Sequence, residues 1–199
     1  MRARMKKHHK PEKNKQGSYR IIAGEWRSRR LAFPDVEGLR PSTDRLRETL
    51  FNWLSSYLDG AQVLDMFAGS GSLGFEALSR GAKHCVFLEL NKNAANALVE
   101  NTDLLGASAQ TIQIDAIRWA SESNEMFDVV FLDPPFRKNL VVSALESLIS
   151  SGALAPNAFV YIEQEKEMPA PRTPSGWHLL REKEAGQVCY RLYEACTSE

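Results

Sequence analysis

Apolar and polar positions follow two alternating patterns along most of the chain. Short apolar runs, each ended by a polar residue or a glycine, predict strands at residues 62–66, 84–89, 110–114, 127–132 and 158–163. Apolar residues at helical spacing between those runs predict helices over roughly 72–80, 92–105 and 138–150. Because strands that alternate with helices form a parallel sheet covered on both faces, this part of the chain is expected to be α/β.

Two further strands are predicted after the proline-rich stretch from Pro169 to Pro174. They occupy 177–183 and 187–194, and Glu184-Ala185-Gly186 between them has the composition of a hairpin turn. The expected sheet therefore has seven strands, mostly parallel, with an antiparallel hairpin at its C-terminal end.

The first sixty residues show a different pattern. Alternation from Tyr19 to Ala23 and a second run from Leu31 to Phe33 predict a small β-hairpin with arginines at or near its turn. A polar helix start at Arg40-Pro41-Ser42-Thr43-Asp44 follows, and apolar residues then recur on one helical face at Leu46, Leu50, Trp53, Leu54, Tyr57 and Leu58. We therefore expect a leader at 1–18 without fixed structure, a hairpin and helix at 19–58, and the main domain at 59–199.

Composition limits the kinds of protein this chain can be. With 199 residues and 43% hydrophobic residues, it can bury one good core. Its longest apolar stretches are far shorter than the roughly 20 residues that span a bilayer, so we expect no membrane segment. The three cysteines have no metal-binding spacing and suit a reducing cytoplasm, so we expect a cytoplasmic protein without a metal.

The net charge of zero conceals a strong asymmetry. Residues 1–47 hold 14 Lys and Arg against 5 Asp and Glu, a net charge of +9, and the remaining residues carry −9. A basic segment on an acidic body is typical of a protein that binds a polyanion, because each phosphate contact releases a counterion. For residues 1–17 alone, a solvated leader without a binding role explains the charge equally well.

A glycine-rich segment, Gly69-Ser70-Gly71-Ser72-Leu73-Gly74, follows the first predicted strand of the main domain. By itself this pattern fits NAD, FAD or S-adenosylmethionine. Asp65, at the end of that strand, favours the last of these. Its carboxylate would repel a pyrophosphate, but it would attract the ammonium and sulfonium groups of S-adenosylmethionine.

Two more carboxylates end the next two predicted strands. Glu89 is placed to accept hydrogen bonds from two ribose hydroxyls, and Asp115 could accept from the adenine amine or cap the segment that follows it. The expected cofactor-binding residues are Asp65, Phe67, Ala68, Gly69, Ser70, Gly71, Glu89, Leu90, Asp115 and Ala116.

The predicted reaction centre is Asp133-Pro134-Pro135-Phe136, directly after the fourth strand of the main domain. Two prolines offer carbonyl oxygens without N–H donors, and together with the Asp133 carboxylate they form an acceptor-only cradle for a planar NH2 group. Phe136 offers a ring for stacking an extruded base. The sequence therefore predicts methyl transfer to an exocyclic amine of a nucleobase.

These motifs together resemble the RsmD family of class I methyltransferases, which have a Rossmann-like fold. The resemblance covers about residues 19–194 and is carried by Arg20–Gly24, Arg40–Arg45, Arg47–Leu54, Leu64–Gly71, Asp133–Phe136 and Gly186–Tyr193. It implies a bacterial enzyme that methylates the N2 amine of one guanine in the 16S ribosomal RNA of an assembled or partly assembled small subunit. We expect such an enzyme to be a monomer, with RNA contacts from Arg20, Arg27, Arg29, Arg30, Arg40, Arg45 and Arg47.

Several alternatives stay open at this point. Many amine methyltransferases carry Asn where this chain has Asp133, so adenine N6 chemistry on DNA or RNA is possible. A protein glutamine methyltransferase would present a similar amide, and a non-catalytic ribosome-assembly factor could retain the fold. For Arg45 and Arg47, contacts with Thr49 and Phe51 on the helix surface are as good an interpretation as RNA binding.

Overall fold

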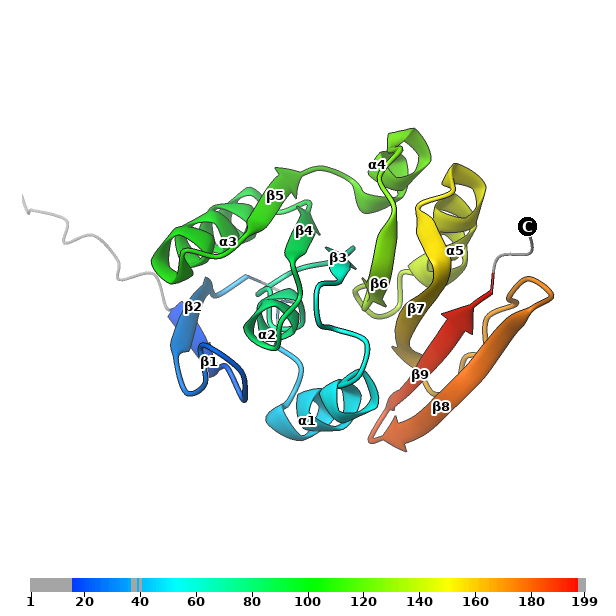
Figure 1. Ribbon diagram of the computed structural model, residues 1–199, viewed down its shortest axis with the longest axis horizontal. Helices are drawn as coiled ribbons and strands as arrows, with labels where there is room; N and C mark the ends of the chain where they lie inside the picture. Colours follow the sequence, from blue (N-terminus) through cyan, green and yellow to red (C-terminus); the bar gives the residue numbers. More distant parts are fainter. Residues whose placement is uncertain (1–15, 37–38, 40, 197–199) are drawn as a thin grey trace, which may run out of the picture.

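A seven-stranded sheet organises the structure. The computed structural model describes residues 16–36, 39 and 41–196. Its main sheet has the strand order β5-β4-β3-β6-β7-β9-β8 (Figure 1). The strands are β3 (Gln62–Asp65), β4 (His84–Glu89), β5 (Ala109–Gln113), β6 (Phe127–Leu132), β7 (Leu154–Glu165), β8 (Trp177–Ala185) and β9 (Val188–Ala195).

The directions of the strands confirm the predicted sheet. Neighbouring strands from β5 to β7 run parallel, whereas β9 is antiparallel to both β7 and β8. The order reverses at β3 and β6, the first and fourth strands of the main domain. Open α/β sheets bind their ligands at such a switch point, beyond the carboxyl ends of the strands.

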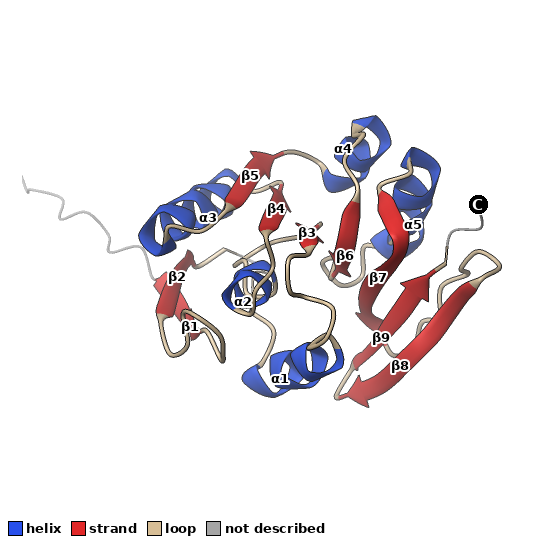
Figure 2. Ribbon diagram, viewed as in Figure 1, coloured by secondary structure: helices blue, strands red, loops and turns tan. Residues whose placement is uncertain are grey.

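Helices cover both faces of this sheet (Figure 2). Residues of α1 (Asp44–Trp53), α2 (Gly74–Ser79) and α3 (Lys92–Leu105) belong to one buried apolar cluster. The cluster on the opposite face takes residues from α4 (Ala116–Glu122) and α5 (Leu140–Ser151). Helix α4 is not among the predicted helices, because two turns are too short to show a periodic pattern in the sequence.

The N-terminal hairpin consists of β1 (Gln16–Arg20) and β2 (Arg30–Pro34), so its first strand lies earlier than the predicted Tyr19–Ala23. After Ile21, which still bonds to the backbone of Ser28 and Arg29, the chain leaves the hairpin, because the N–H groups of Ile22 and Ala23 donate to the Glu76 carboxylate on α2. Gly24 follows with φ +82°, and a Cβ there would overlap the carbonyl of Ser79. The loop after β1 is thus fixed to α2 by its backbone.

Helix α1 begins where the sequence indicated and ends earlier. The Thr43 side chain accepts from the N–H of Leu46 and caps the helix, and Leu50 is fully buried. The helix stops at Trp53, so Tyr57 does not continue the apolar face. Its side chain is 44% exposed and its ring stacks on Phe159 of β7.

The hairpin and α1 are not separate from the sheet. Tyr19, Ile21 and Leu31 belong to the same buried cluster as Val63 of β3 and Phe131 of β6. No helix in the described part of the chain is long and apolar enough to cross a bilayer.

Candidate active site

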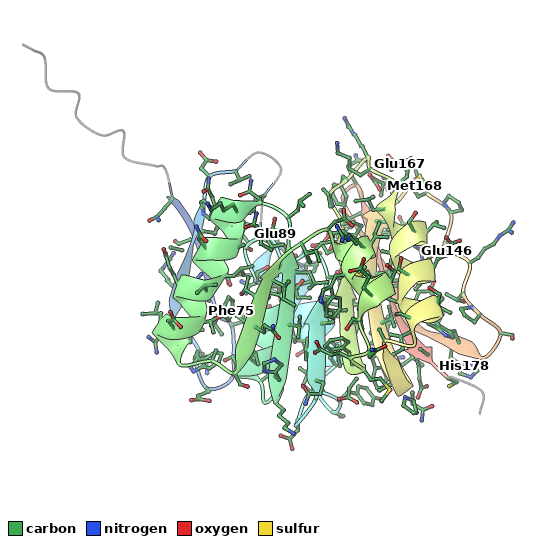
Figure 3. All side chains as sticks on the ribbon, turned by 90° about the horizontal axis from the view of Figure 1, so that it is seen from above. Phe75, Glu89, Glu146, Glu167, Met168 and His178 are labelled. Carbon is green, nitrogen blue, oxygen red and sulfur yellow. The ribbon has the colours of Figure 1, made fainter. Side chains whose placement is uncertain are left out.

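The carboxyl ends of β3 and β6 bring the two predicted halves of the site together. In the parallel register Asp65 pairs with Phe131, two residues before Asp133. Because side chains alternate along a strand, Asp65 and Asp133 point to the same face of the sheet. Glu89 ends the neighbouring strand β4, and Figure 3 shows it toward the same end of the molecule as Met168, beyond the end of β7.

The segment after β3 is a tight loop that requires glycine at two positions. Gly69 has φ +54° and Gly71 has φ +76°, both in the left-handed region that other residues rarely adopt. A Cβ on Gly69 would meet the Leu39 side chain and the Phe67 carbonyl at 3.8 Å, an ordinary contact, whereas a Cβ on Gly71 would overlap Leu98 of α3 and the ring of Phe75. Gly71 therefore serves helix packing, and the less crowded backbone lies at Gly69.

Asp65 is buried beneath this loop. Its carboxylate accepts a hydrogen bond from the N–H of Gly74, 3.0 Å away, at the first residue of α2. Burial raises the pKa of the Asp65 carboxyl to about 7, a rise that the Gly74 N–H opposes and the charge of Glu89 reinforces. The ionised form of such a group gains most from a cationic ligand, which fits the ammonium and sulfonium of S-adenosylmethionine.

Glu89 holds the loop from the next strand. One carboxylate oxygen accepts from the N–H of Gly69 at 2.8 Å, and the other accepts from the N–H of Asn91 at 2.6 Å. Leu90, between these contacts, is 68% exposed at the start of the crossover to α3. Glu89 is partly exposed, so it can also face a ligand that lies across the strand ends.

Asp115 and Ala116 stand at the start of α4. The Asp115 side chain accepts from the N–H of Arg118 at 3.0 Å, which makes Asp115 the N-cap of that helix. The residue is exposed and Ala116 is buried. The capping interpretation thus matches the structure, and it leaves the second oxygen of Asp115 free of any hydrogen bond among the described residues.

The tetrad Asp133-Pro134-Pro135-Phe136 begins directly after the end of β6. Pro134 is buried, whereas Pro135 is exposed and Phe136 is 45% exposed. Burial raises the pKa of the Asp133 carboxyl well above its usual range. The charges of Glu163 and Asp65 add to this rise, and a contact with the Ser42 side chain opposes it. The tetrad thus exposes the Phe136 ring to solvent, close to the Asp133 carboxylate, whose basicity is increased.

Sequence reasoning missed two groups beside the tetrad. Glu163, near the end of β7, is 6% exposed, and the phenol of Tyr161 donates to it at 2.8 Å. The available signal was the apolar run at 158–163, which ends in Glu as the run of β4 does. A carboxylate near the carboxyl end of a buried strand indicates a position at the edge of the sheet where α/β proteins bind their ligands.

The predicted RNA-facing arginines fall into distinct environments. Arg27, Arg29 and Arg30 are exposed on the loop between β1 and β2 and at the start of β2, and Arg45 is exposed on α1. Arg20 is exposed and lies 2.9 Å from the Asp44 carboxylate. Arg40 lies outside the described residues.

The expectation that Arg47 faces RNA does not fit its position, because its side chain is fully buried. The guanidinium contacts the Asp44 carboxylate at 2.7 Å and the Glu76 carboxylate at 3.4 Å, and it donates to the carbonyl of Arg20 at 2.8 Å. Glu76 also pairs with Arg80 at 2.8 Å. Arg47 therefore belongs to an internal charge cluster, and the expected surface contact with Phe51 is also incorrect for it.

Among the described residues, no group of three or more His, Cys, Asp or Glu side chains could hold a metal ion. The glycine-rich loop after β3 and the tetrad after β6 together bring carboxylates, prolines, backbone groups and one exposed aromatic ring to the switch point of the sheet.

Comparison with known proteins agrees with this arrangement. The family model described as "Conserved hypothetical protein 95" matches residues 19–194. Ribosomal RNA small subunit methyltransferase D of Haemophilus influenzae is 50% identical over 188 residues, which cover 91% of this chain and 96% of that protein. The protein of that name from Escherichia coli K12 is 45% identical over 186 residues, covering 93% and 94%.

A solved structure supports the same relationship. The protein described as the putative methyltransferase yhhF from Escherichia coli superposes with a TM-score of 0.85 at 44% identity, over 90% of this chain and 99% of its own. The match thus extends over the sheet, the hairpin and the tetrad alike. This chain belongs to the RsmD family, the family of ribosomal RNA small subunit methyltransferase D.

Proposed function

We propose that this protein transfers a methyl group from S-adenosylmethionine to the exocyclic N2 amine of a guanine in 16S ribosomal RNA, within an assembled or partly assembled small subunit. The observation that carries the proposal is the acceptor-only tetrad at the switch point of the sheet, beside the glycine loop. Family membership supports a cofactor-dependent methylation of small-subunit RNA. The choice of guanine N2 rests on the resemblance and on the chemistry of the tetrad.

The tetrad addresses a specific chemical difficulty. The lone pair of an exocyclic amine is delocalised into the base, so the nitrogen is a weak nucleophile. Hydrogen bonds from both N–H groups to the Asp133 carboxylate and the Pro134 carbonyl would favour a more tetrahedral nitrogen. Phe136 would hold the base by stacking, a contact worth ~1 to 3 kcal/mol.

Proton transfer follows bond formation rather than preceding it. S-adenosylmethionine supplies an electrophilic methyl group on a sulfonium, which is already a good leaving group. The new N–CH3 bond forms as the S–CH3 bond breaks, and the nitrogen then carries a positive charge. It becomes strongly acidic only at that point, so Asp133 needs to accept its proton after transfer. The protein therefore contributes mainly positioning and electrostatics.

The cofactor residues fit this cosubstrate in their donor and acceptor types. Asp65 would attract its cationic end, Gly69 would leave its backbone approachable, and Glu89 would accept from the ribose hydroxyls. Asp115 keeps one oxygen for the adenine amine. Phe67, Ala68, Ser70, Gly71, Leu90 and Ala116 complete the proposed lining.

The proposed RNA surface comprises the loop between β1 and β2 together with α1. It includes Arg27, Arg29 and Arg30, with Arg20 and Arg45 nearby. We propose that the segment at 19–58 faces the RNA, that the domain at 59–199 carries the chemistry, and that the protein acts as a cytoplasmic monomer.

Mapping the methylated nucleotide tests the proposal directly. Small subunits that lack the modification are incubated with labelled S-adenosylmethionine, and the RNA is digested to nucleosides. We expect the label on guanine N2. Label on adenine, or label only on naked duplex DNA, would contradict the proposal, and label on a protein of the subunit would favour glutamine as the target.

A second prediction concerns the loop between β1 and β2 that carries Arg27 and Arg29, here called the arginine loop. Replacing Arg27 and Arg29 with Gln removes two exposed charges without touching the buried cluster, so binding to the small subunit should weaken. The slope of log K against log salt should fall by about 0.7 to 1 for each phosphate that the variant no longer neutralises. Lys183→Gln is the matched control, because Lys183 is exposed on β8, the edge strand on the far side of the sheet from the hairpin (Figure 1). An unchanged slope in the double variant would remove these arginines from the RNA surface.

A further inference from the structure

The end of β7 places a second acidic side chain beside the reaction centre. In the parallel pairing of β6 and β7, Leu132 lies opposite Ile162, so Asp133 and Glu163 are the next pair along the two strands. Phe131 and Tyr161, the pair two residues earlier, point into the cluster beneath α1. Side chains alternate along a strand, so Asp133 and Glu163 point toward that same face.

This neighbour is not an ordinary surface charge. Glu163 is 6% exposed, and one of its carboxylate oxygens accepts the hydroxyl of Tyr161 at 2.8 Å. Asp133 beside it is half-buried, and two adjacent carboxylates with so little contact with water cannot both stay ionised without a large cost. The arrangement therefore favours a single proton held between the two groups.

The other groups that face the pair relieve its repulsion only in part. The Ser42 side chain, in the segment before α1, opposes the rise in the pKa of Asp133, whereas the charge of Asp65 on β3 adds to it. Tyr190 of β9 interacts with Glu163. Among the residues that the structure describes, no lysine or arginine acts on the Asp133 carboxyl. Burial raises the pKa of Glu163 as it does that of Asp133, and the Tyr161 hydroxyl only partly opposes this rise.

We propose that Glu163 is a positioning residue that acts through Asp133: the two carboxyl groups share one proton, and this sharing holds the Asp133 carboxyl in place. The Tyr161 hydroxyl donates to the Glu163 carboxyl and so holds Glu163 in place. One oxygen of Asp133 then stays available as an acceptor and aimed at the amine of the substrate. This inference rests on the proposed function, because it assigns Glu163 a part in presenting the amine acceptor.

The proton balance of the reaction is compatible with this arrangement. The N–H proton released after methyl transfer passes to Asp133, and the pair then holds two protons. One of them leaves to water, which restores the singly protonated pair for the next turnover. The step needs no reactant beyond the methyl donor, the amine and water.

Three variants separate this role from a purely structural one. Glu163→Gln keeps the size and a donor group but cannot ionise. Glu163→Ala removes the donor, and Tyr161→Phe removes the contact that holds it. Glu146→Gln is the matched control, because Glu146 is exposed on α5, and α5 covers the opposite face of the sheet from Tyr161.

The first measurement needs no substrate. Infrared difference spectra of the ligand-free parent against Glu163→Gln should show a protonated-carboxyl band at neutral pH that disappears as the pH rises. The variant Asp65→Asn identifies how much of the protonated-carboxyl band comes from Asp65, whose pKa also lies near neutrality. If the difference spectrum lacks the band, the pair holds no proton that depends on Glu163 and the inference is wrong.

The second measurement is the pH profile of kcat/KM on small subunits. The parent should lose activity at alkaline pH as the pair loses its shared proton, and Glu163→Gln should retain activity to higher pH because its amide does not titrate. Glu163→Ala should lower kcat by roughly tenfold to a hundredfold, with unchanged affinity for S-adenosylmethionine. An alkaline limb that is the same in the parent and Glu163→Gln would overturn the inference. A parent that methylates no RNA would instead refute the proposed function, while the infrared test would stand.

Discussion

The variant Asp133→Ala is expected to lose methyl transfer by about a thousandfold, since it removes both an acceptor for the amine and the acceptor of its proton. The protein should stay folded, because burial makes an ionised Asp133 costly in the parent and the substitution removes that cost. Its affinity for S-adenosylmethionine, measured by calorimetry, should equal that of the parent. Single-turnover kinetics on small subunits then give the loss in the chemical step.

Asp103→Ala is the matched control for this prediction. Asp103 is an exposed carboxylate on α3, away from the strand ends, and should retain full activity. If Asp133→Ala also retained full activity, the tetrad would not be the reaction centre. A loss of cofactor affinity in Asp133→Ala would instead place Asp133 among the cofactor-binding residues.

The largest loss of stability is expected from Glu76→Ala. Glu76 is fully buried and accepts from Arg47, Arg80 and the N–H groups of Ile22 and Ala23. Its removal leaves the buried Arg47 with fewer partners, and the Nε of that arginine already has none. Breaking a buried ion pair from one side typically costs about 3 to 5 kcal/mol, so the free energy of unfolding in urea should fall by that order.

An exposed ion pair on α4 provides the comparison. Glu122 pairs with Arg118 at 3.2 Å one helical turn away, and both side chains are more than half exposed. Glu122→Ala should change the free energy of unfolding by less than about 1 kcal/mol. If the two variants were equally stable, the charge cluster under the hairpin would contribute nothing to the fold.

The mostly parallel sheet and the order of the motifs along the chain could be predicted from the sequence because both depend on local patterns. The apolar runs of β4 and β6 end where predicted, at Glu89 and Leu132. The glycine loop and the tetrad then follow strands that meet at the switch point. Rules about parallel sheets thus sufficed to bring Asp65 and Asp133 to one edge without any coordinates.

Other features depend on contacts between distant parts of the chain. Arg47 looks like a surface residue in the sequence, and only its contact with Glu76, 29 positions away, explains its burial. The early end of β1 has the same origin, because the backbone after it bonds to Glu76 rather than to β2. Helical periodicity also suggested that Tyr57 faces the core, whereas its ring stacks on Phe159 outside the helix.

The attachment of the hairpin loop to α2 has a consequence for how these enzymes can diversify. Ser79 accepts from the N–H of Trp26 and donates to the carbonyl of Ala23, while the Gly24 backbone lies against it. The arginine loop cannot therefore be exchanged alone, as an antibody loop can. A graft of this loop has to carry its two anchors, Glu76 and Ser79, so under the proposed RNA-binding role of the loop, recognition and the main sheet domain are inherited as one unit.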